Sequence, residues 1–202
     1  MRSYGDKPKW FLDKVPSGLL PVIELDGKMI TESLVIMQIL DETFPGRPLL
    51  PTGDEAVVGS DPTASLAAAN ELLRLERELF SWWCQLTFRP SGPFGGGAQV
   101  GFEECLDKVE VALSRNPDSP WLLDVPGGGP SIVDLQYISH VERMTASVLY
   151  WKGINIRNRY DRWPSLERWF RAFESRPAYI ATKSDYYTHV QDIPPQCECG
   201  HA

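Results

Sequence analysis

Residues 18–27, which read GLLPVIELDG, decide the fold of this chain. The β-prone run at 21–25 predicts a short strand, and the Asp-Gly pair that follows is a turn signal typical of antiparallel hairpins. Residues 28–30 predict the returning strand. We therefore expect a β-hairpin with a proline at the start of its first strand.

A helix is expected directly after this hairpin. Thr31 is a favourable N-cap, and the helix runs to about Phe44, where the Pro-Gly pair at 45–46 stops it. Strand, turn, strand and helix together form the first unit, residues 1–46. Three apolar positions are expected to bury against the hairpin: Leu34, either Ile36 or Met37, and Leu40.

The rest of the chain is predicted to be helical. Residues 47–61 are rich in Gly, Pro and Asp and predict a linker. Residues 62–182 predict an all-α domain, because apolar residues recur there at helical spacing. On its first helix, which ends near Phe88, the apolar stripe comprises Leu66, Leu72, Leu73, Leu79, Phe80 and Leu86.

Two further signals fix helix starts in this domain. Ser131 and Asp134 form a capping-box pattern that opens a helix through Leu149. Pro164 opens the last clear helix, and residues 183–202 predict an irregular tail.

Composition excludes several classes of protein. The 202 residues are 43% hydrophobic and 23% charged, with a net charge of −7, which favours a packed globular chain. The acidic balance and the lack of a basic run argue against a nucleic-acid groove. No apolar stretch approaches the ~18 residues of a membrane span, and the N-terminus has no secretory h-region.

The cysteines favour a reducing compartment, because they are too few for a disulfide scaffold. The expected location is an intracellular one, a plastid or the cytoplasm. Two of them are expected to be buried within helices and two lie near the C-terminus with His201; the set is Cys84, Cys105, Cys197 and Cys199. The C-terminal group falls short of a four-ligand zinc site, so no metal is expected. His140 has no visible nucleophile partner.

Three stretches resemble the glutathione S-transferase family. They are residues 7–11 (KPKWF), 16–27 (PSGLLPVIELDG) and 30–45 (ITESLVIMQILDETFP). The proline, the Glu-Ser pair and the Phe-Pro ending occur in family order and spacing. The opening is most similar to the cysteine-type branches, which are omega, lambda, dehydroascorbate reductase and iota. Residues 186–196 resemble the endings of iota-like members from photosynthetic organisms.

The resemblance implies an α+β fold, in which an incomplete thioredoxin-like N-terminal domain precedes an all-α C-terminal domain of the transferase type. The family's reactive residue lies at the end of a first strand, which we expect to lie upstream of this sequence. The catalytic residue therefore stays unknown. The 202 residues alone are expected to show little or no thiol transfer.

Five glutathione-binding residues follow from the resemblance: Lys7, Leu20, Pro21, Glu32 and Ser33. The Leu20–Pro21 bond is expected to be cis, with the Leu20 backbone pairing with the ligand like an added strand. A helix N-terminus favours a carboxylate, to which Ser33 donates, while Glu32 accepts from the ligand's ammonium. Lys7 supplies positive charge. Simple helix capping and an exposed lysine are the alternative interpretations.

The first long helix carries Trp82, Trp83 and Cys84 near Arg77. In this architecture the helix borders the cleft for the second substrate, where aromatic rings stack on planar ligands. Core packing or a subunit contact is the alternative, and it is the preferred interpretation.

Two functions remain open at this point. The first is glutathione-dependent thiol transfer or deglutathionylation in the complete protein, through a mixed disulfide. The second is a non-catalytic interaction module or a subunit of a larger assembly, with a protein partner or a second copy. A nucleotide-cofactor oxidoreductase lacks its glycine motif. Glutathione is thus the expected co-substrate, and neither nucleic acid nor membrane is an expected partner.

Overall fold

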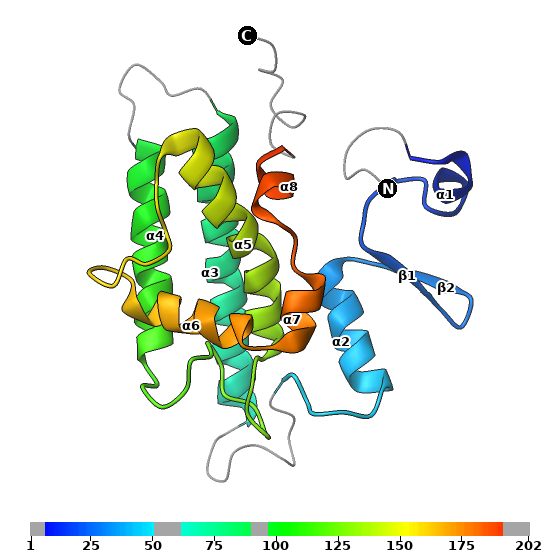
Figure 1. Cartoon of the computed structure of the whole chain (residues 1–202). Coiled ribbons are helices and arrows are strands. Elements are labelled where there is room, and N and C mark those ends of the chain that lie inside the picture. Colours follow the sequence, from blue (N-terminus) through cyan, green and yellow to red (C-terminus); the bar gives the residue numbers. More distant parts are fainter. Residues whose placement is uncertain (1–6, 51–61, 90–96, 192–202) are drawn as a thin grey trace.

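The computed structural model describes residues 7–50, 62–89 and 97–191, with only the backbone at 62–65. A small N-terminal unit and a helical domain lie side by side (Figure 1). The elements in chain order are α1 (Lys9–Lys14), β1 (Val22–Leu25), β2 (Lys28–Thr31), α2 (Ser33–Thr43), α3 (Pro62–Phe88), α4 (Gly97–Ser114), α5 (Ile132–Lys152), α6 (Pro164–Glu174), α7 (Pro177–Thr182) and α8 (Tyr186–Gln191).

The predicted hairpin is confirmed. β1 and β2 pair antiparallel, and Val22 lies opposite Thr31 while Leu25 lies opposite Lys28. Asp26 and Gly27 both have positive φ, 48° and 75°, as the two-residue turn requires. The strands therefore close at residues 26–27 and open toward residues 21 and 32.

The helix after the hairpin differs from the prediction at its start. Thr31 is the last residue of β2, not a cap, and Glu32 takes the N-cap position of α2. The pairing of Thr31 with Val22 holds it in the sheet, which overrides its capping preference. The predicted end holds, since α2 stops at Thr43 with Phe44 as its C-cap.

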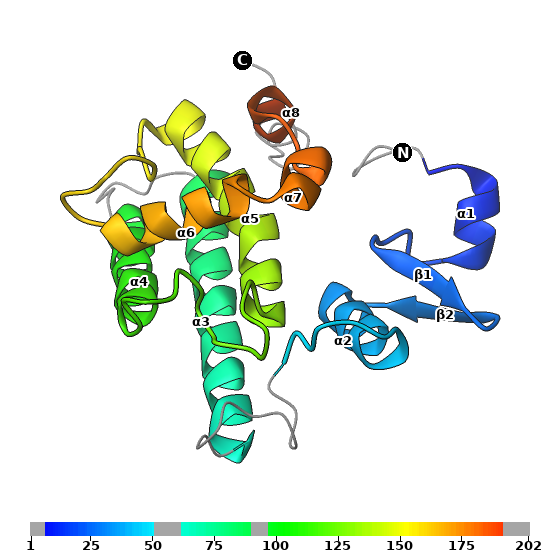
Figure 2. The ribbon, with the colours of Figure 1, turned by 60° about the horizontal axis from the view of Figure 1, so that its bottom comes forward.

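The packing of α2 was only partly predicted. Ile36 is buried, whereas Leu40 is 37% exposed, so the expectation for Leu40 was wrong. Leu34 and Met37 are half-buried and pack against the core of the helical domain. Figure 2 shows the reason, since α2 lies between the hairpin and the helical domain and so divides its apolar residues between two partners.

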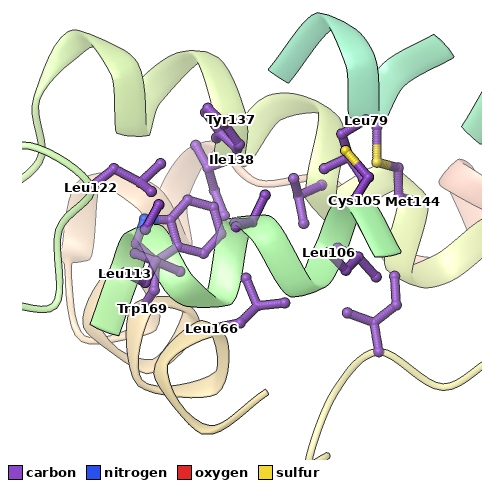
Figure 3. Packing of buried hydrophobic residues seen from close by; sticks show 14 of the residues in the cluster. Leu79, Cys105, Leu106, Leu113, Leu122, Tyr137, Ile138, Met144, Leu166 and Trp169 are labelled. Atoms are coloured by element: carbon purple, nitrogen blue, oxygen red, sulfur yellow. The ribbon is translucent and has the colours of Figure 1, made fainter. Parts of the chain in front are cut away.

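The helical domain is built on α3, α4 and α5. Their apolar residues meet in one core, to which α6 adds Leu166 and Trp169 (Figure 3). Leu66, which was predicted to belong to the apolar stripe of α3, is 52% exposed and lies outside this core. The predicted capping box at Ser131 and Asp134 is present at the start of α5. Of these three helices, α5 contacts α2 of the N-terminal unit.

Three short helices were not predicted: α1, α7 and α8. α8 lies within residues 183–202, which were expected to be irregular, and its Val190 is 2% exposed. Each of the three helices has only six residues, too few for an apolar period to be recognised. Residues 51–61 of the predicted linker (47–61) and the C-terminal group of Cys197, Cys199 and His201 lie outside the described residues.

Candidate functional site

The hairpin register brings the predicted ligand residues together. Val22 and Thr31 are the last pair at the open end of the hairpin. Pro21 precedes Val22 and Glu32 follows Thr31, so both lie just beyond this pair. Leu20 and Ser33 flank them. Four of the five candidates therefore gather at the open end of one hairpin, although they come from two segments of the chain.

One side of this end is formed by Leu20 and Pro21. The peptide bond between them is cis, which confirms that prediction. Leu20 is 49% exposed and Pro21 is also exposed. Both residues lie directly before β1, at the surface of the N-terminal unit.

The other side is the N-terminus of α2. Glu32 has a φ of 69°, a conformation that non-glycine residues seldom adopt, and its side chain makes no capping bond. The first intrahelical bond runs from the Ile36 N–H to the Glu32 carbonyl at 2.9 Å. The N–H groups of the first turn of α2 have no acceptor within the helix, and no acidic side chain lies in that turn. This end therefore suits a carboxylate.

Lys7 approaches from a third segment. A Cβ added to Gly18 would lie 4.0 Å from the Lys7 side chain, which places Lys7 beside the loop that leads to Leu20. Gly18 itself has a φ of 64°, so the loop needs glycine there. All five candidates thus belong to the N-terminal unit, and their roles in binding glutathione stay predictions.

The described thiols lie in the helical domain. Cys105 is buried on α4, and burial raises its pKa to about 12. Cys84 is half-buried on α3; burial raises its pKa as well, and the opposing charges of Arg143, Arg77 and Arg89 do not overcome that effect. Neither thiol has the lowered pKa of a reactive cysteine. Cys105 is buried within a helix as predicted, whereas Cys84 lies within a helix but is only half-buried.

The aromatic residues of α3 favour the packing interpretation. Trp83 is 1% exposed, and its Nε1–H donates to the Ser147 hydroxyl on α5 at 2.9 Å. Its ring packs against Phe80 and Phe88. Trp83 is therefore part of the core and is not a stacking platform for a ligand.

A cluster of polar and charged side chains that no sequence pattern predicted lies between α3 and α5. The His140 Nδ1 lies 2.5 Å from Glu76 Oε1, and Arg77 donates to the same carboxylate. Burial raises the pKa of Glu76, but the hydrogen bonds from His140 and Arg77 outweigh it and leave the pKa lowered. His140 thus has a partner, an acid 64 positions away, which no local pattern reveals.

The described part of the chain offers neither a metal cluster nor a bilayer-spanning helix. No group of three or more His, Cys, Asp or Glu side chains there is placed to hold a metal ion. None of the described helices has the length and apolar character that a bilayer span needs. The hairpin end remains the candidate site.

The fold defines a class of two-part proteins, in which a small unit with a β-hairpin precedes an all-α domain. Residues 2–48 match the glutathione S-transferase N-terminal domain, and residues 67–172 match the glutathione S-transferase C-terminal domain. The chain belongs to the glutathione S-transferase family.

Relatives in plants support the cysteine-type branch. Protein IN2-1 homolog A of Oryza sativa is 31% identical over 183 residues, which cover 89% of this chain and 66% of that protein. Glutathione S-transferase DHAR2 of Arabidopsis thaliana is 47% identical over 131 residues, covering 55% of this chain and 58% of the relative. The chain thus spans about two thirds of the first of these relatives.

The fold also matches solved structures. A rice transferase, GST1 (OsGSTU1) in complex with glutathione, superposes with a TM-score of 0.77 at 22% identity, covering 98% of this chain and 83% of that one. The dehydroascorbate reductase of Chlamydomonas reinhardtii gives a TM-score of 0.70 at 17% identity, with coverage of 92% and 76%. The α+β architecture of a thioredoxin-like unit and a helical domain is therefore confirmed.

Proposed function

We propose that the hairpin end binds glutathione and that the complete protein uses it in thiol transfer or deglutathionylation. The observation that carries this proposal is the register of Val22 with Thr31, which gathers Leu20, Pro21, Glu32 and Ser33 at one place. The branch of the family that includes DHAR2 and the rice IN2-1 homolog supports the thiol chemistry.

The chemistry of the site suits a charged tripeptide. The free N–H groups and partial positive charge at the start of α2 bind the carboxylate of the γ-glutamyl unit. Ser33 adds a hydroxyl donor, and the Glu32 carboxylate accepts from the ammonium group. The exposed backbone of Leu20 pairs with the cysteinyl unit as an added strand does, and Lys7 supplies charge for the glycyl carboxylate.

Redox chemistry needs a thiolate in addition to this binding surface. A thiolate that attacks a glutathione mixed disulfide takes up the glutathionyl group and releases the substrate thiol. Cys84 and Cys105 are unsuited to this step, because burial raises the pKa of both. We leave the nucleophile unassigned and place the protein in the reducing environment of a plastid or the cytoplasm.

A separate observation favours a second function, that of a non-catalytic interaction module. The N-terminal unit exposes several large apolar side chains, which is unusual for a surface that contacts only solvent. They are Trp10, Leu12, Leu19, Leu20, Met29, Val35, Leu40 and Phe44.

Calorimetric titration with reduced glutathione tests the binding proposal. Glu32→Gln removes a charge-assisted hydrogen bond worth about 1.5–3 kcal/mol, so affinity should fall by about tenfold or more. Glu42→Gln is the matched control, because Glu42 is an exposed acid at the other end of α2. Equal affinity of the two variants would remove Glu32 from the site.

Turnover separates the two functions. A glutathione mixed disulfide should be reduced by the thiol-transfer enzyme, with a rate that Glu32→Gln lowers and Glu42→Gln does not. Glutathione binding without turnover, in the 202-residue chain and in the longest natural form of the protein, would favour the interaction module.

A further inference from the structure

The segment that follows α2 crosses to the loop that precedes α5. Arg47 Nη2 donates to the Pro130 carbonyl at 2.8 Å, and the Ile132 N–H donates to the Leu49 carbonyl at 2.9 Å. Residues 127–129, directly before Pro130, are three glycines. The side chain of Arg47 is therefore held in place beside a glycine loop.

A second arginine reaches the same loop. The three glycines have φ angles of 76°, 70° and 89°, which residues other than glycine rarely adopt. A Cβ added to Gly129 would lie 3.5 Å from Arg47 Nη2 and 3.5 Å from Arg176 Nη1. The two guanidinium groups are thus at most 7.0 Å apart, which is the sum of these two distances. We call Arg47 and Arg176 the arginine pair.

No carboxylate of the described residues forms an ion pair with either arginine. Two acids are close enough to act on Arg47, but both are bound elsewhere. Asp41 accepts a backbone N–H with both oxygens at 3.0 Å, and the buried Asp134 caps α5. The Arg176 guanidinium instead lies 5.9 Å from the centre of the Trp121 ring. Burial and the charge of Arg176 lower the pKa of Arg47, and the two carboxylates offset this only in part.

An apolar pocket adjoins the arginine pair along the C-terminal half of α2. It has a volume of about 250 Å³, and Arg47 lies in its wall. Its other lining residues are Met37, Leu40, Asp41, Phe44 and Leu49. An apolar cavity of about 150 Å³ holds a benzene molecule, so this pocket has room for one aromatic ring. The site therefore combines a cationic end with an apolar end.

The cationic end suits a phosphate group. A guanidinium binds phosphate oxygens through two parallel N–H bonds, and a doubly charged anion neutralises both arginines, whereas one carboxylate carries a single charge. The N–H groups of Gly127 and Gly129 have no acceptor among the described residues. Glycine also lets a phosphate come close to the backbone.

We propose that the arginine pair binds the phosphate group of a small organic phosphate, whose apolar part lies in the adjoining pocket of α2. The hairpin end lies at the N-terminus of α2 and the arginine pair beyond its C-terminus. The 11 residues of α2 span about 16 Å, so the two sites are separate. The inference does not depend on glutathione binding, because no residue of the hairpin end takes part.

Calorimetric titration of the 202-residue chain with phenyl phosphate tests this inference. The native chain should bind it, and Arg176→Ala should lower the affinity by at least about tenfold, because charge-assisted hydrogen bonds are lost. Arg176 is exposed and donates no side-chain hydrogen bond within the described residues, so the variant should fold. Lys152→Ala is the matched control, since it removes one exposed positive charge at the far end of α5.

Inorganic phosphate and Phe44→Ala test the apolar end. The native chain should bind inorganic phosphate more weakly than phenyl phosphate. Phe44→Ala should weaken the binding of phenyl phosphate by about threefold or more and leave that of inorganic phosphate unchanged. Circular dichroism shows that each variant is folded.

Three results would contradict the inference. Failure of the native chain to bind phenyl phosphate, or equal effects of Arg176→Ala and Lys152→Ala, would overturn the site. Equal affinities of the native chain for inorganic phosphate and phenyl phosphate would overturn the assignment of an organic phosphate, because the pocket would then add nothing.

Discussion

The indole Nε1–H of Trp169 donates to the Asp134 carboxylate at 2.8 Å, and this bond joins α6 to the start of α5. The same carboxylate accepts from the backbone N–H groups of Leu122 and Ser131 and from the Ser131 hydroxyl. Asp134 is fully buried, so it satisfies four donors that no water reaches. One side chain thus caps α5 and fixes two neighbouring segments to it.

Replacing this carboxylate should be severely destabilising. Asp134→Ala leaves the four donors buried without an acceptor and removes the cap, so the free energy of unfolding should fall by about 3–5 kcal/mol. Denaturant titration measures it. Asp118→Ala, at an exposed acid, should change stability by less than about 0.5 kcal/mol. A similar small loss at Asp134 would show that the network does not hold α5.

Glu167 should make stability depend on pH in the acid range. Burial raises the pKa of Glu167, but bonds from Arg157 and the Asn158 N–H outweigh it and hold the pKa at about 2, below the ordinary 4.5. The folded state therefore gains stability above pH 4.5, and this gain is lost as pH falls from 4.5 toward 2.

The measurement is the unfolding midpoint at several pH values. Glu167→Gln should be less stable at neutral pH and should lose less stability than the native chain between pH 4.5 and 2. Glu104→Gln, at an exposed position of α4, should keep the native profile. Parallel profiles for the native chain and Glu167→Gln would contradict the assigned role.

Gly101 should tolerate no side chain. A Cβ there would lie 2.8 Å from three ring atoms of Trp82 on α3, so α3 and α4 would have to separate. Gly101→Ala should cost about 1–3 kcal/mol from overpacking, partly offset by ~1 kcal/mol of helix propensity. Gly97→Ala is the control, because nothing lies within 4 Å of a Cβ at that position. The melting temperature of both variants is measured by thermal unfolding. An unchanged melting temperature in Gly101→Ala would show that this contact is loose.

Cys105 should resist alkylation in the folded protein. Its thiol is 1% exposed and its pKa is raised to about 12, so only ~10⁻⁴ of it is thiolate at pH 8. Peptide mass spectrometry after treatment with iodoacetamide should show slow labelling of Cys105, which becomes rapid in denaturant. Equal labelling in the native and denatured chain would show that α4 opens readily.

The sequence alone determined the features whose signals are local. The β-prone run at 21–25 and the turn at Asp26-Gly27 predicted the hairpin, because only residues a few positions apart take part. The capping box of Ser131 and Asp134 is likewise complete within four residues. The candidate site at Glu32 and Ser33 was accessible in the same way, through its resemblance to a family pattern.

Only the tertiary structure decided what distant segments do to one another. It paired His140 with Glu76, 64 positions away, and it kept Thr31 in the sheet by pairing it with Val22. It also left Leu40 exposed, because α2 packs on two partners whose positions its own periodicity cannot specify. Burial and long-range pairing depend on where each element lies in space, and local propensity carries no information about that.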